Sequence, residues 1–118
     1  MLESGESTES TMTVSESILN EATRRIVEQF HPVKVILFGS QARGEAHEKS
    51  DIDLIVLCAA FDDRYDLEAR MYASLRGIPC PIDLMVYTPT EFEQERLMFG
   101  TAAHPAWREG KVVYEQAA

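Results

Sequence analysis

The sequence predicts one domain of the α/β (α+β) class, because helical and strand patterns alternate along a chain long enough for one core. The chain has 118 residues, which suits a single domain. Residues 1–13 are rich in Ser, Thr and Glu and almost free of apolar side chains. Such a segment buries too little apolar surface to offset its ordering entropy. We therefore expect a disordered acidic tail at 1–13 and a folded domain at 14–116.

The first half of the domain reads as a helix followed by a buried strand. Apolar side chains recur at helical spacing from Val14, with Ser15 or Ser17 available as a cap, and Pro32 ends the run. The stretch VKVILF, residues 33–38, is β-branched and almost wholly apolar. This composition is typical of a strand covered on both faces.

A second strand is expected soon after the first. A short helical turn at 40–45 and a polar loop at 46–50 lead to DIDLIVL, residues 51–57. The connection is too short for the crossover of about a dozen residues that parallel neighbours require. The two strands are therefore expected to pair antiparallel or to lie in a mixed sheet.

The next elements are a helix and a third strand. Residues 62–76 read as an amphipathic helix ended by Gly77, followed by PIDLMVY at 81–87. The side chains expected to face inward are Tyr65, Leu67 or Ala69, Tyr72 and Leu75.

The C-terminal part predicts a further helix and a last strand. TPTEF, residues 88–92, combines a Thr cap, Pro at the first helical position and an early Glu, so a helix begins there. A helix end or turn at 108–110 precedes the short strand 111–115. Phe99 and Trp107 are expected in the core or facing a partner, and His104 at a turn.

The charge balance narrows the classes of partner. Lys and Arg total 11 against 20 Asp and Glu, giving a formal net charge of −9. A surface of this sign does not favour direct binding of nucleic acid or of an anionic membrane. A metal ion or a basic partner suits it better.

The cysteines and the hydropathy predict a cytoplasmic protein without a membrane span. Cys58 and Cys80 lie in apolar stretches of a chain that lacks secretory-signal features, so free thiols in a reducing cytosol are expected rather than a disulfide. No apolar run approaches the roughly 18 residues that a membrane helix needs.

Three aspartates are the candidate metal ligands. Asp51 and Asp53 lie two apart on a predicted strand, so both side chains leave the same face at about 6.6–6.8 Å along the strand. Two such charges repel each other and lose hydration unless a cation joins them, and carboxylates suit Mg²⁺ or Mn²⁺. Asp83 holds the corresponding place in strand 81–87. If the two strands are neighbours, three carboxylates line one edge, enough for two Mg²⁺ ions about 3.5–4 Å apart.

Gly39 and Ser40 form a candidate phosphate-binding corner. Glycine lets the backbone approach a ligand closely, and the helix that starts at Ser40 presents free N–H groups beside a hydroxyl. Each feature also has a purely structural explanation: a tight turn at Gly39, a solvated strand edge at Asp51 and Asp53, and a surface position for Asp83. The combination at the strand ends is what predicts a functional site.

These residues together resemble the nucleotidyltransferase superfamily that includes DNA polymerase β, and specifically its minimal nucleotidyltransferase branch with the MntA-type antitoxins. Weaker similarity extends from the first helix to residues 108–115 and covers all but the acidic tail. The residues that carry the resemblance are Gly39, Ser40, Ala42, Arg43, Gly44, Ser50, Asp51, Ile52, Asp53, Leu54 and Asp83.

The resemblance implies a mixed β-sheet backed by helices and a two-magnesium site held by Asp51, Asp53 and Asp83. It also implies that Gly39, Ser40 and Ser50 contact ATP or another nucleoside triphosphate, and that Asp83 helps to activate the acceptor. Arg43 has two interpretations: the guanidinium contacts phosphate, or it ties the turn to a nearby carboxylate.

The resemblance further implies transfer of a nucleoside monophosphate to a hydroxyl with release of pyrophosphate. Minimal members are commonly paired with a helical HEPN-domain toxin, and they modify a tyrosine of that toxin with AMP. Two alternatives stay open: an antitoxin that neutralises its partner by occlusion, and a transferase acting on a small molecule such as an antibiotic.

Overall fold

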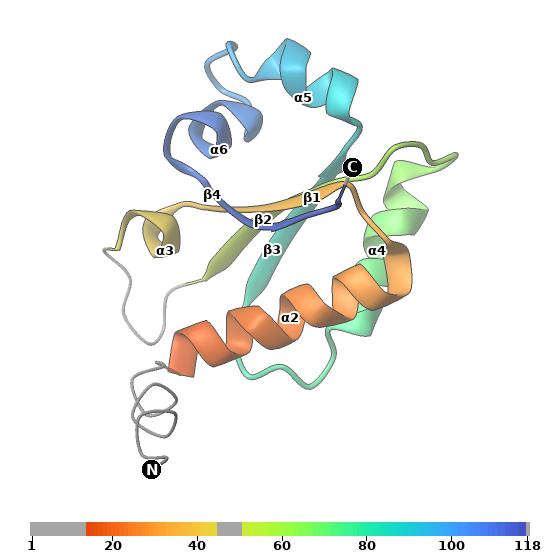
Figure 1. Cartoon of the computed structure of the whole chain (residues 1–118), viewed down its shortest axis with the longest axis vertical. Helices are drawn as coiled ribbons and strands as arrows, with labels where there is room; N and C mark the ends of the chain where they lie inside the picture. The colour runs from red at the N-terminus through yellow and green to blue at the C-terminus, as the bar shows by residue number, and fades with distance from the viewer. Residues whose placement is uncertain (1–13, 45–50, 118) are drawn as a thin grey trace.

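A four-stranded sheet with helices on both faces forms the protein (Figure 1). The computed structural model describes residues 14–44 and 51–117, so the expected tail at 1–13 and loop at 46–50 lie outside the described residues. In chain order the elements are α2 (Val14–Phe30), β1 (Lys34–Phe38), α3 (Ser40–Arg43), β2 (Ile52–Leu57), α4 (Arg64–Ser74), β3 (Ile82–Tyr87), α5 (Pro89–Glu95), α6 (Ala103–Glu109) and β4 (Lys111–Glu115).

The strand directions are mixed, as predicted. The order across the sheet is β3-β2-β1-β4. β1 pairs antiparallel with both β2 and β4, whereas β2 and β3 run parallel. The short connection between β1 and β2 permits only the antiparallel arrangement, and the β2–β3 connection contains α4, which makes a parallel crossover possible.

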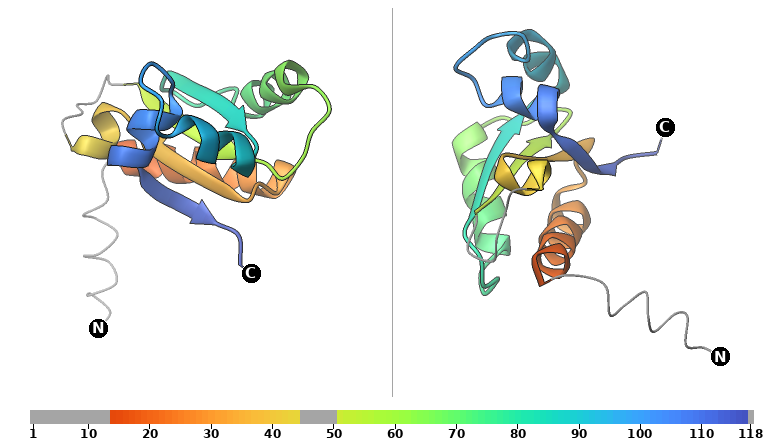
Figure 2. Two further views of the ribbon diagram at one scale, coloured as in Figure 1. Left: turned by 90° about the horizontal axis from the view of Figure 1, so that it is seen from above. Right: turned by 90° about the vertical axis from the view of Figure 1, so that its left-hand side faces the viewer.

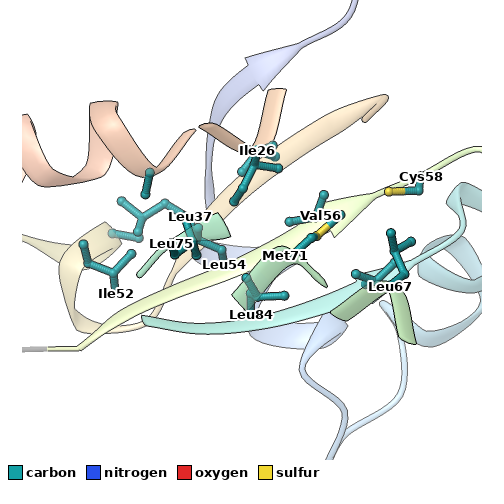
Figure 3. Packing of buried hydrophobic residues seen from close by; sticks show 14 residues of the cluster. Ile26, Leu37, Ile52, Leu54, Val56, Cys58, Leu67, Met71, Leu75 and Leu84 are labelled. Atoms are coloured by element: carbon teal, nitrogen blue, oxygen red, sulfur yellow. The ribbon is translucent and has the colours of Figure 1, made fainter. Parts of the chain in front are cut away.

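Two apolar clusters pack on opposite faces of the sheet. α2 and α4 cover one face and α5 and α6 the other (Figures 1 and 2). Figure 3 shows the first cluster, in which Ile26 of α2 and Met71 of α4 lie near Leu54 and Val56 of β2. β2 is buried on both faces, because Ile55 and Leu57 belong to the second cluster. Packing on both faces therefore fixes the position of β2, whose first residues lie at the aspartates.

The free edge of β3 is covered by three side chains of α4. The Tyr72 hydroxyl accepts a hydrogen bond from the Leu84 amide (2.9 Å) and donates one to the Leu84 carbonyl (3.2 Å). A Glu68 carboxylate oxygen accepts from the Val86 amide at 2.9 Å, and Arg64 Nε donates to the Val86 carbonyl at 3.1 Å. The three α4 residues are spaced by four, so they share one helix face. They satisfy backbone groups that an edge strand otherwise exposes.

The inward face predicted for α4 is wrong in part. Leu67, Met71 and Leu75 are the buried row, while Tyr65 is 82% exposed and Tyr72 lies at the β3 edge. The expectation placed both tyrosines in the core. Residues 67, 71 and 75 are spaced by four and form the face turned to the sheet, so Tyr65 falls outside that face.

The start of α2 and the region around α6 also differ in detail from the predictions. α2 begins at Val14, so Ser15 and Ser17 lie inside the helix and not at its cap. His104, expected at a turn, lies in the first turn of α6, with Nδ1 2.8 Å from the Arg96 carbonyl oxygen. Phe99 is 87% exposed and Trp107 is also exposed, so neither belongs to the core.

Other local predictions are confirmed. Thr88 caps α5 in a capping box with Glu91, and Pro89 is the first helical residue. Cys58 and Cys80 are both free thiols. Within the described part of the chain, every helix is too short or too polar to cross a membrane.

We expect Tyr72→Phe to lower the free energy of unfolding by about 1–2 kcal/mol, because it leaves the amide and carbonyl of Leu84 without their partner. Urea denaturation followed by circular dichroism measures this loss. Tyr65→Phe is the matched control, since the Tyr65 side chain projects into solvent. Equal stability of the two variants would contradict a role for Tyr72 at the β3 edge.

Candidate functional site

The three predicted acidic residues lie at the same end of the sheet. β1 ends where β2 and β3 begin, because β1 is antiparallel to β2 and β2 is parallel to β3. In the register, Phe38 pairs with Asp53, and Asp53 pairs with Asp83. A hydrogen bond of 3.0 Å from the Ile52 amide to the Pro81 carbonyl aligns the two strand starts. The expected neighbourhood of β2 and β3 is therefore present.

Asp51 differs from the expectation in one respect. It lies one residue before β2 and is exposed, whereas Asp53 is inside the strand and half-buried. Asp83 is the second residue of β3 and is exposed. The half-buried acid is thus flanked by two acids that water can reach.

Gly39 packs directly against the Asp53 side chain. A Cβ atom at residue 39 would lie 2.3 Å from Asp53 Oδ2, a distance that no real Cβ contact tolerates. Gly39 also has φ 78° and ψ −159°, a conformation that is essentially restricted to glycine. The backbone conformation therefore requires glycine at this corner, and a Cβ atom would additionally force the Asp53 carboxylate to move.

The site disfavours the charged form of Asp53. Burial raises the pKa of Asp53, and the nearby carboxylates of Asp83 and Asp51 raise this pKa further. Such an arrangement costs stability in the absence of a cation, and a bound cation would offset the repulsion. The carboxylate donors therefore fit a hard ion such as Mg²⁺.

The three carboxylates do not form a closed cluster. Across residues 14–44 and 51–117, no three His, Cys, Asp or Glu side chains are already gathered as a set of metal ligands. Like charges on adjacent strands are expected to stay apart without a cation between them.

The Gly39–Ser40 corner is closed by the short helix α3. The Gly39 carbonyl accepts hydrogen bonds from the amides of Ala42 (3.1 Å) and Arg43 (3.2 Å). Gly44, at φ 77°, ends the helix in the left-handed conformation. Ser40 is the first residue of α3 and is partly buried. Ser50, the other serine predicted to contact nucleotide, lies outside the described residues.

Arg43 ties α3 to the end of α6. Its Nη1 atom lies 3.2 Å from Glu109 Oε1, which agrees with the second of the two interpretations of this residue. Sequence reasoning missed Glu109, because 66 positions separate the partners and no local spacing connects them. It also missed that Cys80 lies near Asp51: burial raises the pKa of the Cys80 thiol, and Asp51 raises this pKa further.

We expect Gly39→Ala to destabilise the protein more than Gly44→Ala does. Both glycines have positive φ, near 78° and 77°, but a Cβ at Gly44 would meet nothing within 4 Å. Gly44→Ala should cost about 1–2 kcal/mol of unfolding free energy through backbone strain alone. Gly39→Ala adds two further costs: a backbone conformation, φ 78° with ψ −159°, that is essentially restricted to glycine, and the collision with Asp53. Equal losses in urea denaturation would contradict both of these constraints.

We expect Asp53→Asn to raise the melting temperature by a few degrees at neutral pH in EDTA. Because the folded-state pKa of Asp53 lies above its unfolded value, the folded protein binds the extra proton, and wild-type stability falls as pH rises through that interval. The asparagine variant lacks this loss, so its advantage should grow from pH 4 to pH 7 in calorimetry. Asp62→Asn, at the opposite end of β2, is the control. A variant less stable than wild type at every pH would contradict the electrostatic explanation.

Comparison with known proteins agrees with this geometry. The family model of the nucleotidyltransferase domain matches residues 19–106. None of the curated proteins compared with the chain matches it. A candidate nucleotidyltransferase from Sulfolobus solfataricus has a similar structure, with a TM-score of 0.60, 18% identity, and coverage of 85% of this chain and 79% of that chain.

Two toxin–antitoxin structures also align with the chain, with lower TM-scores. One complex with AMP-PNP gives a TM-score of 0.46 at 22% identity, covering 81% of this chain and 73% of the other. A mutant of the pair MntA-HpeT gives 0.49 at 21% identity, covering 83% and 72%. The family model spans most of the chain and includes β1, β2, β3 and the three acids. The protein belongs to the nucleotidyltransferase domain family and is, with that family, a nucleotidyltransferase.

Proposed function

We propose that this nucleotidyltransferase transfers AMP from ATP to a hydroxyl group, a tyrosine of a HEPN-type partner toxin, and thereby acts as an antitoxin. The observation that carries the catalytic part is the alignment of Asp53 with Asp83 on adjacent parallel strands, with the Gly39 backbone against Asp53. The nature of the acceptor and of the partner rests on the resemblance to the minimal nucleotidyltransferase branch.

Asp51, Asp53 and Asp83 are the proposed ligands of two Mg²⁺ ions, with Mn²⁺ as a substitute. Bound metal supplies charge neutralisation of the phosphates and activation of the attacking oxygen. The raised pKa of Asp53 supports this assignment, because perturbed carboxylates gather at functional sites.

The protein's other contribution is placement. Gly39 and Ser40, together with Ser50, are proposed to hold the triphosphate at the end of β1. The acceptor oxygen then bonds to the α-phosphorus as the bond from that phosphorus to the pyrophosphate oxygen breaks, and the proton of the hydroxyl passes to the exposed carboxylate of Asp83. In-line displacement of this kind depends mainly on positioning and electrostatics.

An exposed aromatic surface supports an acceptor carried on a protein. The Phe99 and His104 rings lie 4.7 Å apart between centroids, and His104 and Trp107 lie 6.0 Å apart. Leu97 and Met98 are also exposed beside them. Contiguous exposed apolar side chains of this kind are typical of protein-binding surfaces. The net charge of −9 further suits a basic partner.

The same surface supports the alternative in which the protein neutralises its toxin by occlusion. Binding through α5 and α6 requires no chemistry at the aspartates. Transfer to a small molecule such as an antibiotic has less support, because binding of a small acceptor does not require an exposed aromatic surface. Turnover by the isolated protein with a small hydroxylated acceptor would favour that third function.

We expect label from α-phosphate-labelled ATP with Mg²⁺ to appear on the protein encoded beside this one with wild type and not with Asp51→Asn/Asp53→Asn. The two substitutions remove charge from the proposed metal ligands and keep the side-chain size. Mass spectrometry of the labelled partner identifies the modified residue. Asp62→Asn should transfer label as wild type does.

Two results would contradict this function. Equal labelling by the double variant would exclude the acids from catalysis. A stable complex without label, with each nucleoside triphosphate tried in turn, would establish occlusion, and full toxin neutralisation by the double variant would agree with that result.

A further inference from the structure

The ion pair between Arg43 and Glu109 joins the phosphate corner to a distant helix. α3 has four residues, with Ser40 at its start and Arg43 at its end. The side chain of Arg43 reaches Glu109, the last residue of α6, at 3.2 Å. A helix this short has little rigidity of its own. The position of its first residue therefore depends on what holds its last one.

Glu109 is itself held in a tight corner. The Gly110 amide donates to the Ala106 carbonyl at 3.0 Å and closes the end of α6. A Cβ atom at Gly110 would lie 2.2 Å from the Ala106 oxygen and 2.7 Å from Ile36 Cγ2. The end of α6 thus packs against β1, near the end of the strand that α3 follows, because Lys111 pairs with Leu37 (Figure 1). β1 therefore positions both partners of the ion pair.

The ion pair contributes little to folding stability. The two side chains are 39% and 47% exposed, and exposed ion pairs add little to the free energy of unfolding. Arg43 also lies beside the residues that are predicted to bind the triphosphate. Because this pair joins two segments distant in sequence beside the candidate triphosphate site, we expect it to affect the position of α3 more than the free energy of unfolding.

We propose that Glu109 is a positioning residue for nucleotide binding, which acts through Arg43 to hold α3 and the Gly39–Ser40 corner. This inference rests on the proposed function, since it assigns the corner to the triphosphate. It differs from direct phosphate binding by Arg43, in which the guanidinium itself would contact the nucleotide and Glu109 would compete with that contact.

The test is a charge-reversal cycle on the full-length chain with its partner. Glu109→Gln and Arg43→Gln should each raise KM for ATP on the order of fivefold, the range that a pair of this exposure can support. The double variant should be no worse than either single one, because both remove the same interaction. Arg43→Glu/Glu109→Arg should recover most of the affinity. kcat and the melting temperature should stay close to wild type throughout.

Lys34→Gln/Glu115→Gln is the matched control. This second pair also joins distant segments, at 3.6 Å, but it lies at the opposite end of β1 from α3. KM should not change in that control. A merely structural role for Glu109 would lower the melting temperature and leave KM unchanged, and this result would overturn the proposal.

Failure of the reversed pair to recover affinity would also overturn it, in favour of direct phosphate binding by Arg43. Affinity for a fluorescent ATP analogue, measured on the same variants, separates this inference from the proposed function. If wild type binds the analogue and transfers no label, the proposed function fails, and the dissociation constants of the variants still decide the role of Glu109. If wild type does not bind the analogue, both fail.

Discussion

The rest of the site depends on the register in which Phe38 pairs with Asp53. This pairing places the last residue of β1 beside the half-buried acid, so the chain must turn at Gly39 directly against the Asp53 carboxylate. A slip of one residue would reverse the faces of β2 and turn Asp53 toward the α2 and α4 side. Burial of β2 on both faces makes such a slip costly, because apolar side chains would be exchanged for a carboxylate in a core.

The acidic end and the apolar body of β2 have opposite effects on stability. Burial, and then the nearby carboxylates of Asp83 and Asp51, raise the pKa of Asp53, while Leu54, Ile55 and Val56 are fully buried. Burying large aliphatic side chains contributes about 1.5–3 kcal/mol each, enough to offset an electrostatic penalty at one end of the strand. The fold therefore tolerates three neighbouring carboxylates that a bound cation would stabilise and that destabilise the protein without one.

The outer edge of β3 is covered by α4, whereas the α5 and α6 side of the protein keeps exposed aromatic residues. α4 covers the outer edge of β3 through Arg64, Glu68 and Tyr72, which leaves that edge closed to another strand. On the opposite face, α5 and α6 bury Phe92 and Ala106 against the sheet and leave Phe99 and Trp107 in solvent. The proposed catalytic residues and the exposed aromatic residues thus lie on separate parts of the surface, and the Arg43–Glu109 pair links α3 to α6 between them.

The sequence by itself determined the helices and strands, the mixed α/β class and three candidate acids, because periodicity, capping and turn chemistry act over a few residues. Thr88 and Pro89 at α5 are one example, and the uniformly apolar β1 is another. Only the tertiary structure decided that Gly39 touches Asp53, that Tyr72 covers β3 rather than entering the core, and that Arg43 meets Glu109. Each of these contacts joins segments whose separation is set by strand register and helix packing, and no local pattern encodes that information.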